Sequence, residues 1–352
     1  MFRRIILACV GVLICLGVES LAAENAFLAD PPEPVAEVAF ESGLPIAEGD
    51  DFDFGCGNCN GCGCCCPGWT VAADALFLHR SPARGQKLAS VYPTSIEAIN
   101  SRELTFDHDA GPRLSLIRHT RSCWDLEFNW MSIDGWNSAQ SLGGPGYYSA
   151  SLSVGSVTIM RNPTFVYGSD LRSAEINLRR PLGDCITLLA GYRWVGLDER
   201  YRVDGTDSQS NHSSFTIEAY NQLHGFQMGA EATLLRPCSW LEVEAFAKAG
   251  VFGMSVNQRT QFVWSGGTPY GNGTADETSF LAEIGLTGKV HLTDHWSVRG
   301  GYQVMWIDRL ALAPKQIPGN HYSSAPGGGT NTVISSDELF FHGAMVGLEG
   351  TW

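Results

Sequence analysis

Hydrophobic and polar residues alternate with a two-residue period through most of the chain. In the clearest segment, Trp124, Phe128 and Trp130 fall on one face of an extended strand, while Asp125 and Glu127 fall on the other. A strand separates such sets onto opposite faces, whereas a helix scatters them around its circumference. The pattern therefore predicts an all-β protein.

Ten segments carry this alternation, and each predicts one strand. Their ranges are 69–80, 111–119, 122–133, 170–180, 185–199, 213–234, 239–256, 277–292, 295–309 and 338–352. The linkers alternate between tight and long; the long ones are 81–110, 134–169, 200–212, 257–276 and 310–337. Long external loops and short periplasmic turns are typical of outer-membrane barrels. We therefore predict an antiparallel transmembrane β-barrel of about ten strands, with twelve as the alternative count, in the outer membrane of a Gram-negative-type bacterium.

A soluble β-sandwich is the alternative fold, because it also alternates apolar and polar residues. Its loops have no reason to alternate in length, and its outward face is not expected to be rich in tryptophan. The chain also stops inside its last predicted strand, on Trp352. A terminal aromatic residue on an alternating strand is similar to the assembly signal of bacterial outer-membrane proteins, which favours the barrel.

The segment before the first strand differs in composition. Arg3 and Arg4 precede a short apolar run and small residues near Ala22, which is typical of a secretory signal; an uncleaved anchor is the alternative. The next residues are acidic, rich in Pro and Ala, and without a period, which predicts disorder. The predicted organisation is a signal peptide at 1–22, a disordered leader at 23–54, a Cys-rich segment at 55–67 and the barrel at 68–352.

Composition narrows the classes of partner. The 40 Gly, 10 Trp and 10 Tyr suit many strands with tight turns and interfacial aromatic girdles. The formal charge of -14 argues against a nucleic-acid partner, which needs a basic surface. After the signal there is no stretch of about 18 apolar residues, so no helical membrane span is predicted. The expected partner is the lipid of the outer membrane.

Charged residues of both signs share the face opposite the aromatic one. Lipid does not tolerate exposed charge, so this face is predicted to line the lumen. Its members are Asp74, Arg113, Asp125, Glu127, Glu175, Arg179, Arg193, Glu231, Glu242, Glu244, Lys248, Glu283, Lys289, Arg299 and Glu349. A ten-stranded bore is narrow, and unpaired charges in it are costly. We therefore predict an ion-pair network that fills the bore or leaves a thin water path.

Acidic residues also recur where strands meet the long loops. They are Asp134, Asp170, Asp198, Glu199, Asp276, Glu277, Asp308, Asp337 and Glu338. Polar residues that simply end apolar strands explain them, and so does an outer-rim ring that holds divalent cations such as Ca²⁺. No other cofactor and no resident metal ion is predicted.

Nine cysteines follow the signal: Cys56, Cys59, Cys62, Cys64, Cys65, Cys66, Cys123, Cys185 and Cys238. In an oxidising compartment disulfides are the default, with metal binding or a catalytic thiol as alternatives. The last three cysteines each begin a predicted strand after a tight periplasmic turn. We therefore predict disulfides between the leader and this rim, or with neighbouring envelope proteins.

Several sequence blocks resemble the beta-barrel porin-7 (BBP7) family of planctomycete bacteria. They lie at 68–78, 174–180, 191–199, 221–229, 248–251, 283–288 and 300–311, and include Gly191-Tyr192-Arg193-Trp194 and Gly300-Gly301-Tyr302-Gln303-Val304. The resemblance covers nearly everything after Gly68 and implies an outer-membrane barrel. It implies no substrate and no catalytic residue.

The sequence leaves the biochemical role open between several functions. The first is a structural barrel or a narrow porin-like channel for small solutes and ions. The alternative is a surface receptor or adhesin that acts through the long loops. A barrel-rim hydrolase or acyltransferase is a further alternative, in which His79, Asp107, His108 and His212 converge at one end. These residues have no recognisable spacing, so we predict no catalytic residue and no enzyme.

Overall fold

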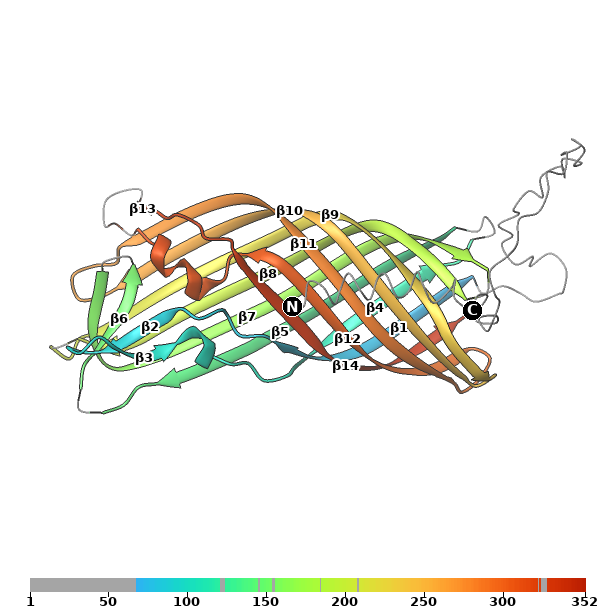
Figure 1. Ribbon diagram of the computed structural model, residues 1–352, viewed down its shortest axis with the longest axis horizontal. Helices are drawn as coiled ribbons and strands as arrows, with labels where there is room; N and C mark the ends of the chain where they lie inside the picture. Colours follow the sequence, from blue (N-terminus) through green and yellow to red (C-terminus); the bar gives the residue numbers. More distant parts are fainter. Residues whose placement is uncertain are drawn as a thin grey trace, which may run out of the picture. The chain divides into compact units, whose positions relative to one another are not determined.

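Ten long antiparallel strands close into a barrel in a computed structural model of the chain (Figure 1). The structure describes residues 68–120, 124–144, 146–153, 156–183, 185–207, 209–321, 323 and 328–352. The barrel strands are β1 (Trp69–Arg80), β4 (Asp109–Arg118), β5 (Asp125–Ser141), β7 (Ser156–Leu182), β8 (Ile186–Thr206), β9 (His212–Cys238), β10 (Leu241–Val263), β11 (Tyr270–His291), β12 (Trp296–Leu310) and β14 (Asp337–Thr351). The predicted ten-stranded barrel is confirmed.

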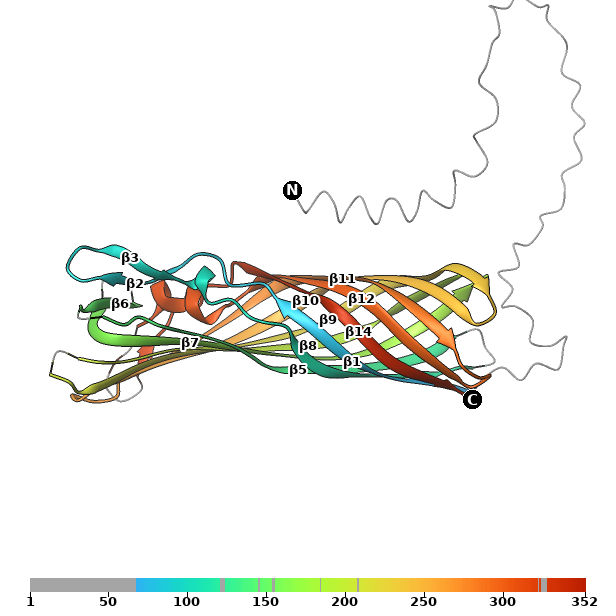
Figure 2. The same ribbon diagram turned by 90° about the horizontal axis from the view of Figure 1, so that it is seen from below.

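Each barrel strand pairs with its neighbour along the chain, and β14 closes the ring on β1. At this seam Thr70 lies opposite Thr351, and Arg80 lies opposite Phe341. Figure 2 places the C-terminal end of β14 at the end of the barrel that carries the short turns. Short turns face the periplasm in bacterial barrels, so this is the periplasmic end and the opposite end is extracellular.

Shorter elements gather at the extracellular end (Figures 1 and 2). They are β2 (Lys87–Val91), β3 (Ile96–Asn100), the 3₁₀ helix η2 (Ser101–Glu103), β6 (Tyr148–Ser153), the 3₁₀ helix η3 (Ala313–Gly319) and β13 (Gly329–Thr330). Strand β2 pairs with β3 and with β6, and β6 pairs with the first part of β7. Part of what was predicted as loop is therefore a small sheet on the rim of the barrel.

Five barrel strands run further into the extracellular side than predicted. Strand β5 ends at Ser141, β7 begins at Ser156, β8 ends at Thr206, β10 ends at Val263 and β11 begins at Tyr270. The predicted long loops 134–169 and 257–276 are thus largely strand. The prediction was wrong there because the outward-facing residues become polar while the two-residue period continues.

The barrel has two zones in which the pattern of burial is inverted. In the periplasmic half, outward residues are apolar and exposed; Phe226 keeps 76% of its surface and Ile176 keeps 54%. In the extracellular half, outward residues such as Arg200 are polar, while inward residues such as Tyr201 and Phe215 are fully buried. The first zone suits lipid and the second suits water, because each hides the surface that its solvent rejects.

Tryptophans mark both edges of the apolar zone. Exposed Trp69, Trp124, Trp240, Trp296 and Trp352 lie at the periplasmic end. At the other edge, Trp194 and Trp306 donate indole hydrogen bonds to Gln222 and Glu338 over 2.9 and 3.2 Å. Along β12 the two edges are ten residues apart, or about 25 Å along the barrel axis at about 3.3 Å per residue and the usual strand tilt. That length matches the apolar band of an outer-membrane barrel.

Within the described residues, no helix has the length and apolar character that a helical membrane span requires.

Candidate functional site: the barrel lumen

The structure places all fifteen predicted lumen residues on the inward face of their strands. Nine carboxylates there face six basic side chains. The carboxylates are Asp74, Asp125, Glu127, Glu175, Glu231, Glu242, Glu244, Glu283 and Glu349, and the bases are Arg113, Arg179, Arg193, Lys248, Lys289 and Arg299. All lie in the periplasmic half, so the charged lumen has the same height as the lipid-facing band around it.

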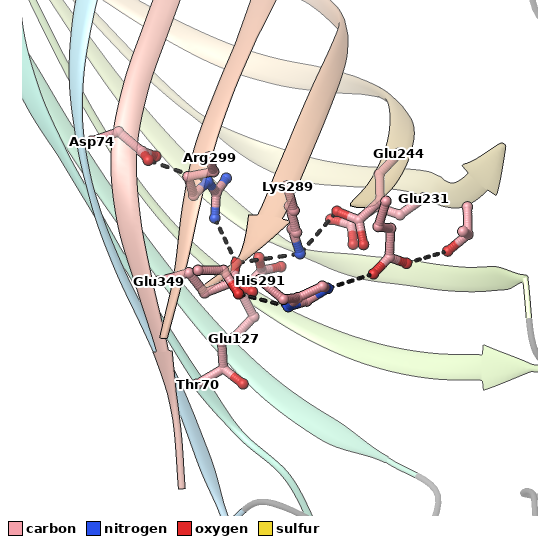
Figure 3. Close-up of polar contacts among 12 residues, drawn as sticks. Thr70, Asp74, Glu127, Glu231, Glu244, Lys289, His291, Arg299 and Glu349 are labelled. Atoms are coloured by element: carbon pink, nitrogen blue, oxygen red, sulfur yellow. Dashed lines mark hydrogen bonds and ion pairs between the residues drawn. The ribbon is translucent and has the colours of Figure 1, made fainter. Parts of the chain in front are cut away.

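One continuous chain of ion pairs crosses six neighbouring strands. Its members, in order of contact, are Arg113, Asp74, Arg299, Glu349, Lys289 and Glu244. Lys289 Nζ lies 2.9 Å from Glu244 and 3.2 Å from Glu349, and Figure 3 shows it between the two carboxylates. Arg299 bridges Asp74 and Glu349 in the same way (Figure 3). Each of these two bases therefore joins two acids from different strands.

A second group of ion pairs spans the bore from β8 to β11. Arg193 is fully buried, and its Nη1 lies 2.7 Å from Glu283 and 3.3 Å from Glu175. Its Nε donates a hydrogen bond to Ser173 Oγ over 2.9 Å. Because β9 and β10 separate β8 from β11, this contact crosses the lumen rather than following the wall. Lys248 on β10 adds a second cation 3.0 Å from Glu175.

Amide side chains connect the remaining charges to this group. Arg179 pairs with Glu127 at 3.1 Å and with Glu231. Asn177 Nδ2 donates to both Glu127 and Glu175 over 3.2 Å. Fourteen of the fifteen predicted lumen residues thus have an ion-pair partner, since Glu242 pairs with an arginine at the rim. The remaining one, Asp125, lies 2.8 Å from His119 Nδ1.

A cavity of about 120 Å³ lies among these charges in the periplasmic half. Its walls carry both signs; Glu127, Glu175, Arg179, Lys248 and Lys289 are among the lining residues. A polar space of this size holds a small number of water molecules. The arrangement therefore provides a wet periplasmic vestibule whose wall charges are already paired.

Above the vestibule most of the large buried side chains are apolar, which the prediction of a charged lumen did not include. One ion pair is embedded there: Arg80 Nη2 lies 2.7 Å from Glu199 Oε1, and both side chains are fully buried. Arg80 also donates to Tyr167 OH over 2.8 Å and stacks on Phe106, 4.4 Å from the ring centroid. Phe106 comes from the segment after η2, so this pair fastens an external segment onto the mouth of the barrel.

The segment 311–320, which contains η3, fills the mouth from inside, and we call it the plug segment. Asn221 on β9 accepts from the Ala311 amide over 2.8 Å and donates to the Ala311 carbonyl over 3.0 Å. At the other end, Gln258 and Thr260 on β10 donate to Asn320 Oδ1 over 2.7 and 2.8 Å. Both ends are therefore held by inward-facing side chains of the wall.

The predicted ring of outer-rim acids does not form as a single ring. Glu199 and Asp337 face inward and are buried, whereas their neighbours Asp198 and Glu338 face outward. Successive residues of a strand point to opposite faces, so adjacent acids are unable to line one surface. The prediction that Glu199 and Asp337 belong to an outer ring of acids is therefore wrong, because both side chains face the interior.

The other rim acids lie on the outward face, except Glu277, which shares the inward parity of Ser279 and Leu281 on β11 and is exposed. Asp134 pairs with Arg172 at 3.0 Å, Asp198 is 3.9 Å from the same arginine, and Glu338 pairs with Arg84. The remaining members are Asp170, which accepts from the Gly135 amide, Asp308, whose carboxylate accepts from the Arg309 amide, and the exposed Asp276 and Glu277. In the described ranges, no group of three or more His, Cys, Asp or Glu side chains is arranged to hold a metal ion. Cation binding at this rim stays a prediction.

The predicted thiols lie partly outside the described residues. Cys185 and Cys238, at the periplasmic ends of β8 and β9, carry free thiols. The other candidates lie outside the described residues: Cys56, Cys59, Cys62, Cys64, Cys65, Cys66 and Cys123, as do the predicted signal, leader and Cys-rich segment. The proposed links between leader and rim stay a prediction.

The histidines considered for a barrel-rim enzyme fall into two places. The rings of His79 and His108 lie 5.4 Å apart, and the ring of His342, which is not among the predicted candidates, lies 5.1 Å from His79. His212 lies at the start of β9, 3.6 Å from Asp204. The pairing of His79 with His342 follows from the β1–β14 seam, which a register argument for the first and last strands predicts.

Several solved outer-membrane proteins are similar to this barrel at low sequence identity. The outer membrane protease OmpT of Escherichia coli matches with 9% identity and a TM-score of 0.41, over 80% of this chain and 97% of that one. The translocator domain of the autotransporter NalP of Neisseria meningitidis matches with 11% identity and a TM-score of 0.38, over 82% and 90%. The toluene transporter TodX of Pseudomonas putida matches with 8% identity and a TM-score of 0.30, over 82% and 90%.

Comparison with sequences gives a clearer result. No curated protein matches the chain. The family model described as Putative beta barrel porin-7 (BBP7) matches residues 149–352, which is more than half of the chain.

Proposed function

This chain belongs to the beta barrel porin-7 family of outer-membrane proteins, and from that premise we propose that it is a structural barrel whose bore is closed to solutes. The observation that carries the proposal is the packing of the extracellular half. There the inward side chains Tyr201, Phe215 and Phe341 of the barrel wall are fully buried. Ala311 and Ile317 of the plug segment are also buried. Interiors packed in this way exclude water.

The charged lumen supports the same conclusion from the other end. A permeating ion must displace carboxylates that are already bound to bases, such as Glu349 between Lys289 and Arg299. Removing one partner from a buried ion pair typically costs about 3–5 kcal/mol. The ion pairs that line the vestibule therefore oppose the passage of ions.

Single-channel recording in planar bilayers tests the proposal. The purified wild-type barrel is expected to insert without discrete conductance steps. A variant in which residues 312–319 are replaced by a Gly-Ser linker of equal length removes the buried part of the plug segment. It is expected to conduct, with small steps set by the remaining vestibule.

A control variant replaces residues 207–211, which connect β8 and β9, with a Gly-Ser linker of equal length and is expected to stay silent. Regular steps from the wild type would overturn the closed-barrel proposal. A silent plug variant that still shows heat-modifiable migration, the mark of a folded barrel, would show that the plug segment is not what closes the bore.

A second role, contact with an external partner, is favoured by the small sheet on the rim. The β2–β3 hairpin exposes Val91, Tyr92 and Ile96, and Ile96 keeps 65% of its surface. Exposed apolar groups at a hairpin tip are typical of interaction surfaces. Tyr92→Ser with Ile96→Ser is expected to reduce adhesion of producing cells; unchanged adhesion argues against this role.

The proposed role is not enzymatic. His212 and Asp204 lie on β9 and β8, whereas His79 and His342 lie on β1 and β14 in another part of the ring. A rim hydrolase needs its base and nucleophile within hydrogen-bond reach. His79 and His108 lie close together, but His212 lies elsewhere in the ring, so the predicted candidates do not form one site.

A further inference from the structure

We infer that the periplasmic edge of β1, β4, β5 and β7 binds the phosphate headgroup of an anionic phospholipid in the inner leaflet. We call the site the Arg-Trp edge; it consists of Trp69, Arg118, Trp124 and Arg180. The inference goes beyond the closed-barrel proposal and does not depend on whether the bore conducts.

Two arginine–tryptophan pairs stand side by side on the lipid-facing surface. The guanidinium carbon of Arg118 lies 4.7 Å from the centroid of the Trp69 ring, and that of Arg180 lies 5.2 Å from the centroid of Trp124. Arg118 Nη1 also donates to the Gly68 carbonyl over 3.0 Å. Stacking on an exposed indole holds each guanidinium at the depth where tryptophan prefers to lie, the boundary between acyl chains and headgroups.

Within the described residues, no carboxylate balances the charge of these two arginines. Among the described residues, neither Arg118 nor Arg180 has a carboxylate within ion-pair distance, whereas Arg113, Arg179 and Arg193 in the lumen all do. A guanidinium has five N–H donors in a planar fork, which suits the oxygens of a phosphate. Arg118 and Arg180 therefore face the lipid with guanidinium N–H groups that have no carboxylate partner among the described residues.

The register brings the two arginines within reach of one lipid or of two adjacent lipids. Arg118 lies opposite Leu126 on β5, and Leu126 lies opposite Leu178 on β7, two residues from Arg180 on the same face. With strands about 4.8 Å apart and about 3.3 Å per residue, the two backbones are about 12 Å apart. Long side chains that extend toward one headgroup region shorten that span.

The surface above the edge selects a lipid over a free anion. Leu116, Leu126, Phe128, Ile176 and Leu178 lie on the same outward face of β4, β5 and β7, one to a few residues further into the membrane, and all are exposed. They form an exposed apolar surface that the acyl chains contact when the phosphate is bound at the Arg-Trp edge. Headgroup charge and acyl contact together match an anionic phospholipid.

Native mass spectrometry of the full-length barrel in detergent tests the site, with titration of phosphatidylglycerol and of phosphatidylcholine that have the same acyl chains. Each arginine near an anionic lipid contributes about fivefold in affinity, so the two together predict a preference of roughly thirtyfold for phosphatidylglycerol. Arg118→Gln with Arg180→Gln is expected to reduce this preference to about onefold to threefold. Arg118→Lys with Arg180→Lys keeps the charge and is expected to keep most of the preference.

The control is Arg200→Gln with Arg202→Gln on the extracellular half, whose preference for phosphatidylglycerol is expected to be unchanged. All variants are first checked for heat-modifiable migration, and the Lys variant reports on the site if the Gln variant does not fold. Equal binding of both lipids by the wild type, or an unchanged preference in the Gln variant, overturns the inference. Full competition by millimolar inorganic phosphate also overturns it, because the site would then bind any free anion.

Discussion

Arg193 provides the strongest single test of the ion-paired lumen. It is fully buried, and it joins β8 to β11 across the bore through Glu283 at 2.7 Å and Glu175 at 3.3 Å. Arg193→Met removes the charge and keeps a long apolar stem that fills much of the same space. The change therefore measures the electrostatic role of Arg193 with little loss of packing.

The expected cost follows from what each carboxylate keeps. Glu175 retains Lys248 at 3.0 Å and the Gln227 amide at 2.7 Å, so it stays compensated. Glu283 loses the ion pair with Arg193 and is left buried without another ion pair among the described residues, with Lys248 opposite it on β10 as the nearest base in the register. Breaking one side of a buried pair costs about 3–5 kcal/mol in free energy of unfolding, and we expect about 4 kcal/mol here.

Adding Glu283→Gln to Arg193→Met distinguishes the cost of the unpaired Glu283 carboxylate from the cost of any packing defect at residue 193. The neutral amide has no charge to desolvate, so the double variant is expected to recover about 2 kcal/mol of the loss. Urea-induced unfolding in lipid vesicles, followed by tryptophan fluorescence, gives the free energies by linear extrapolation.

The control is Arg200→Met, which removes an exposed pair with Glu218 and is expected to cost less than about 1 kcal/mol. The reasoning is refuted if Arg193→Met costs no more than this control. It is also refuted if the double variant is less stable than Arg193→Met alone.

Three further outcomes follow from burial and close packing. Tyr201 buries a hydroxyl for which the described residues offer no hydrogen-bond partner, so Tyr201→Phe is expected to change the free energy of unfolding by less than about 1 kcal/mol. Tyr167→Phe instead removes hydrogen bonds to the buried pair Arg80–Glu199 and is expected to cost about 2–3 kcal/mol in the same urea assay. A Cβ at Gly343 would overlap a backbone carbonyl oxygen of β1 at the closing seam, so a Gly343→Ala barrel is expected to lose heat-modifiable migration at a lower temperature than the wild type. Brominated lipids are expected to quench exposed Trp296 and leave buried Trp136 unquenched when each is the single remaining tryptophan; equal quenching would contradict the assigned membrane zone.

The strand count and the inward set were predictable because both depend on one short-range rule. A two-residue period tells which side chains share a face, and the low tolerance of lipid for charge tells which face looks outward. On β1, the rule separates Asp74 from Phe77 without knowledge of any other strand, and the structure places them inside and outside.

The partners of the charged residues were not predictable from that rule. Arg193 and Glu283 are separated by 90 residues and lie on strands that are not neighbours. Their contact depends on the diameter and shear of the closed ring, which no single strand encodes. The same holds for Lys248, which reaches Glu175 from β10 to β7.

The plug segment was missed because its sequence has no period. It lies in the segment 310–337, whose many Gly, Ser and Asn residues predict a loop. One signal was present: Leu310-Ala311-Leu312-Ala313 is a short apolar run inside a polar linker. Loops lie on the surface because a buried loop must satisfy its backbone, so an apolar run there indicates a segment that folds inward. Asn221 supplies the backbone partner that makes this burial feasible.

The inversion of the pattern also gives the position of the membrane boundary. On β8 the outward residues change from Trp194, through Gly196, to Asp198, and on β9 they change from Phe226 to Gln222. The register pairs Gly196 with Gln222, so both strands change at one level of the barrel. A boundary set by side-chain chemistry alone has no reason to align between strands, whereas one imposed by a flat lipid surface must align. The coincidence therefore argues that the outward pattern was shaped by the bilayer, and that the apolar interior above it forms because that part of the wall stands in water.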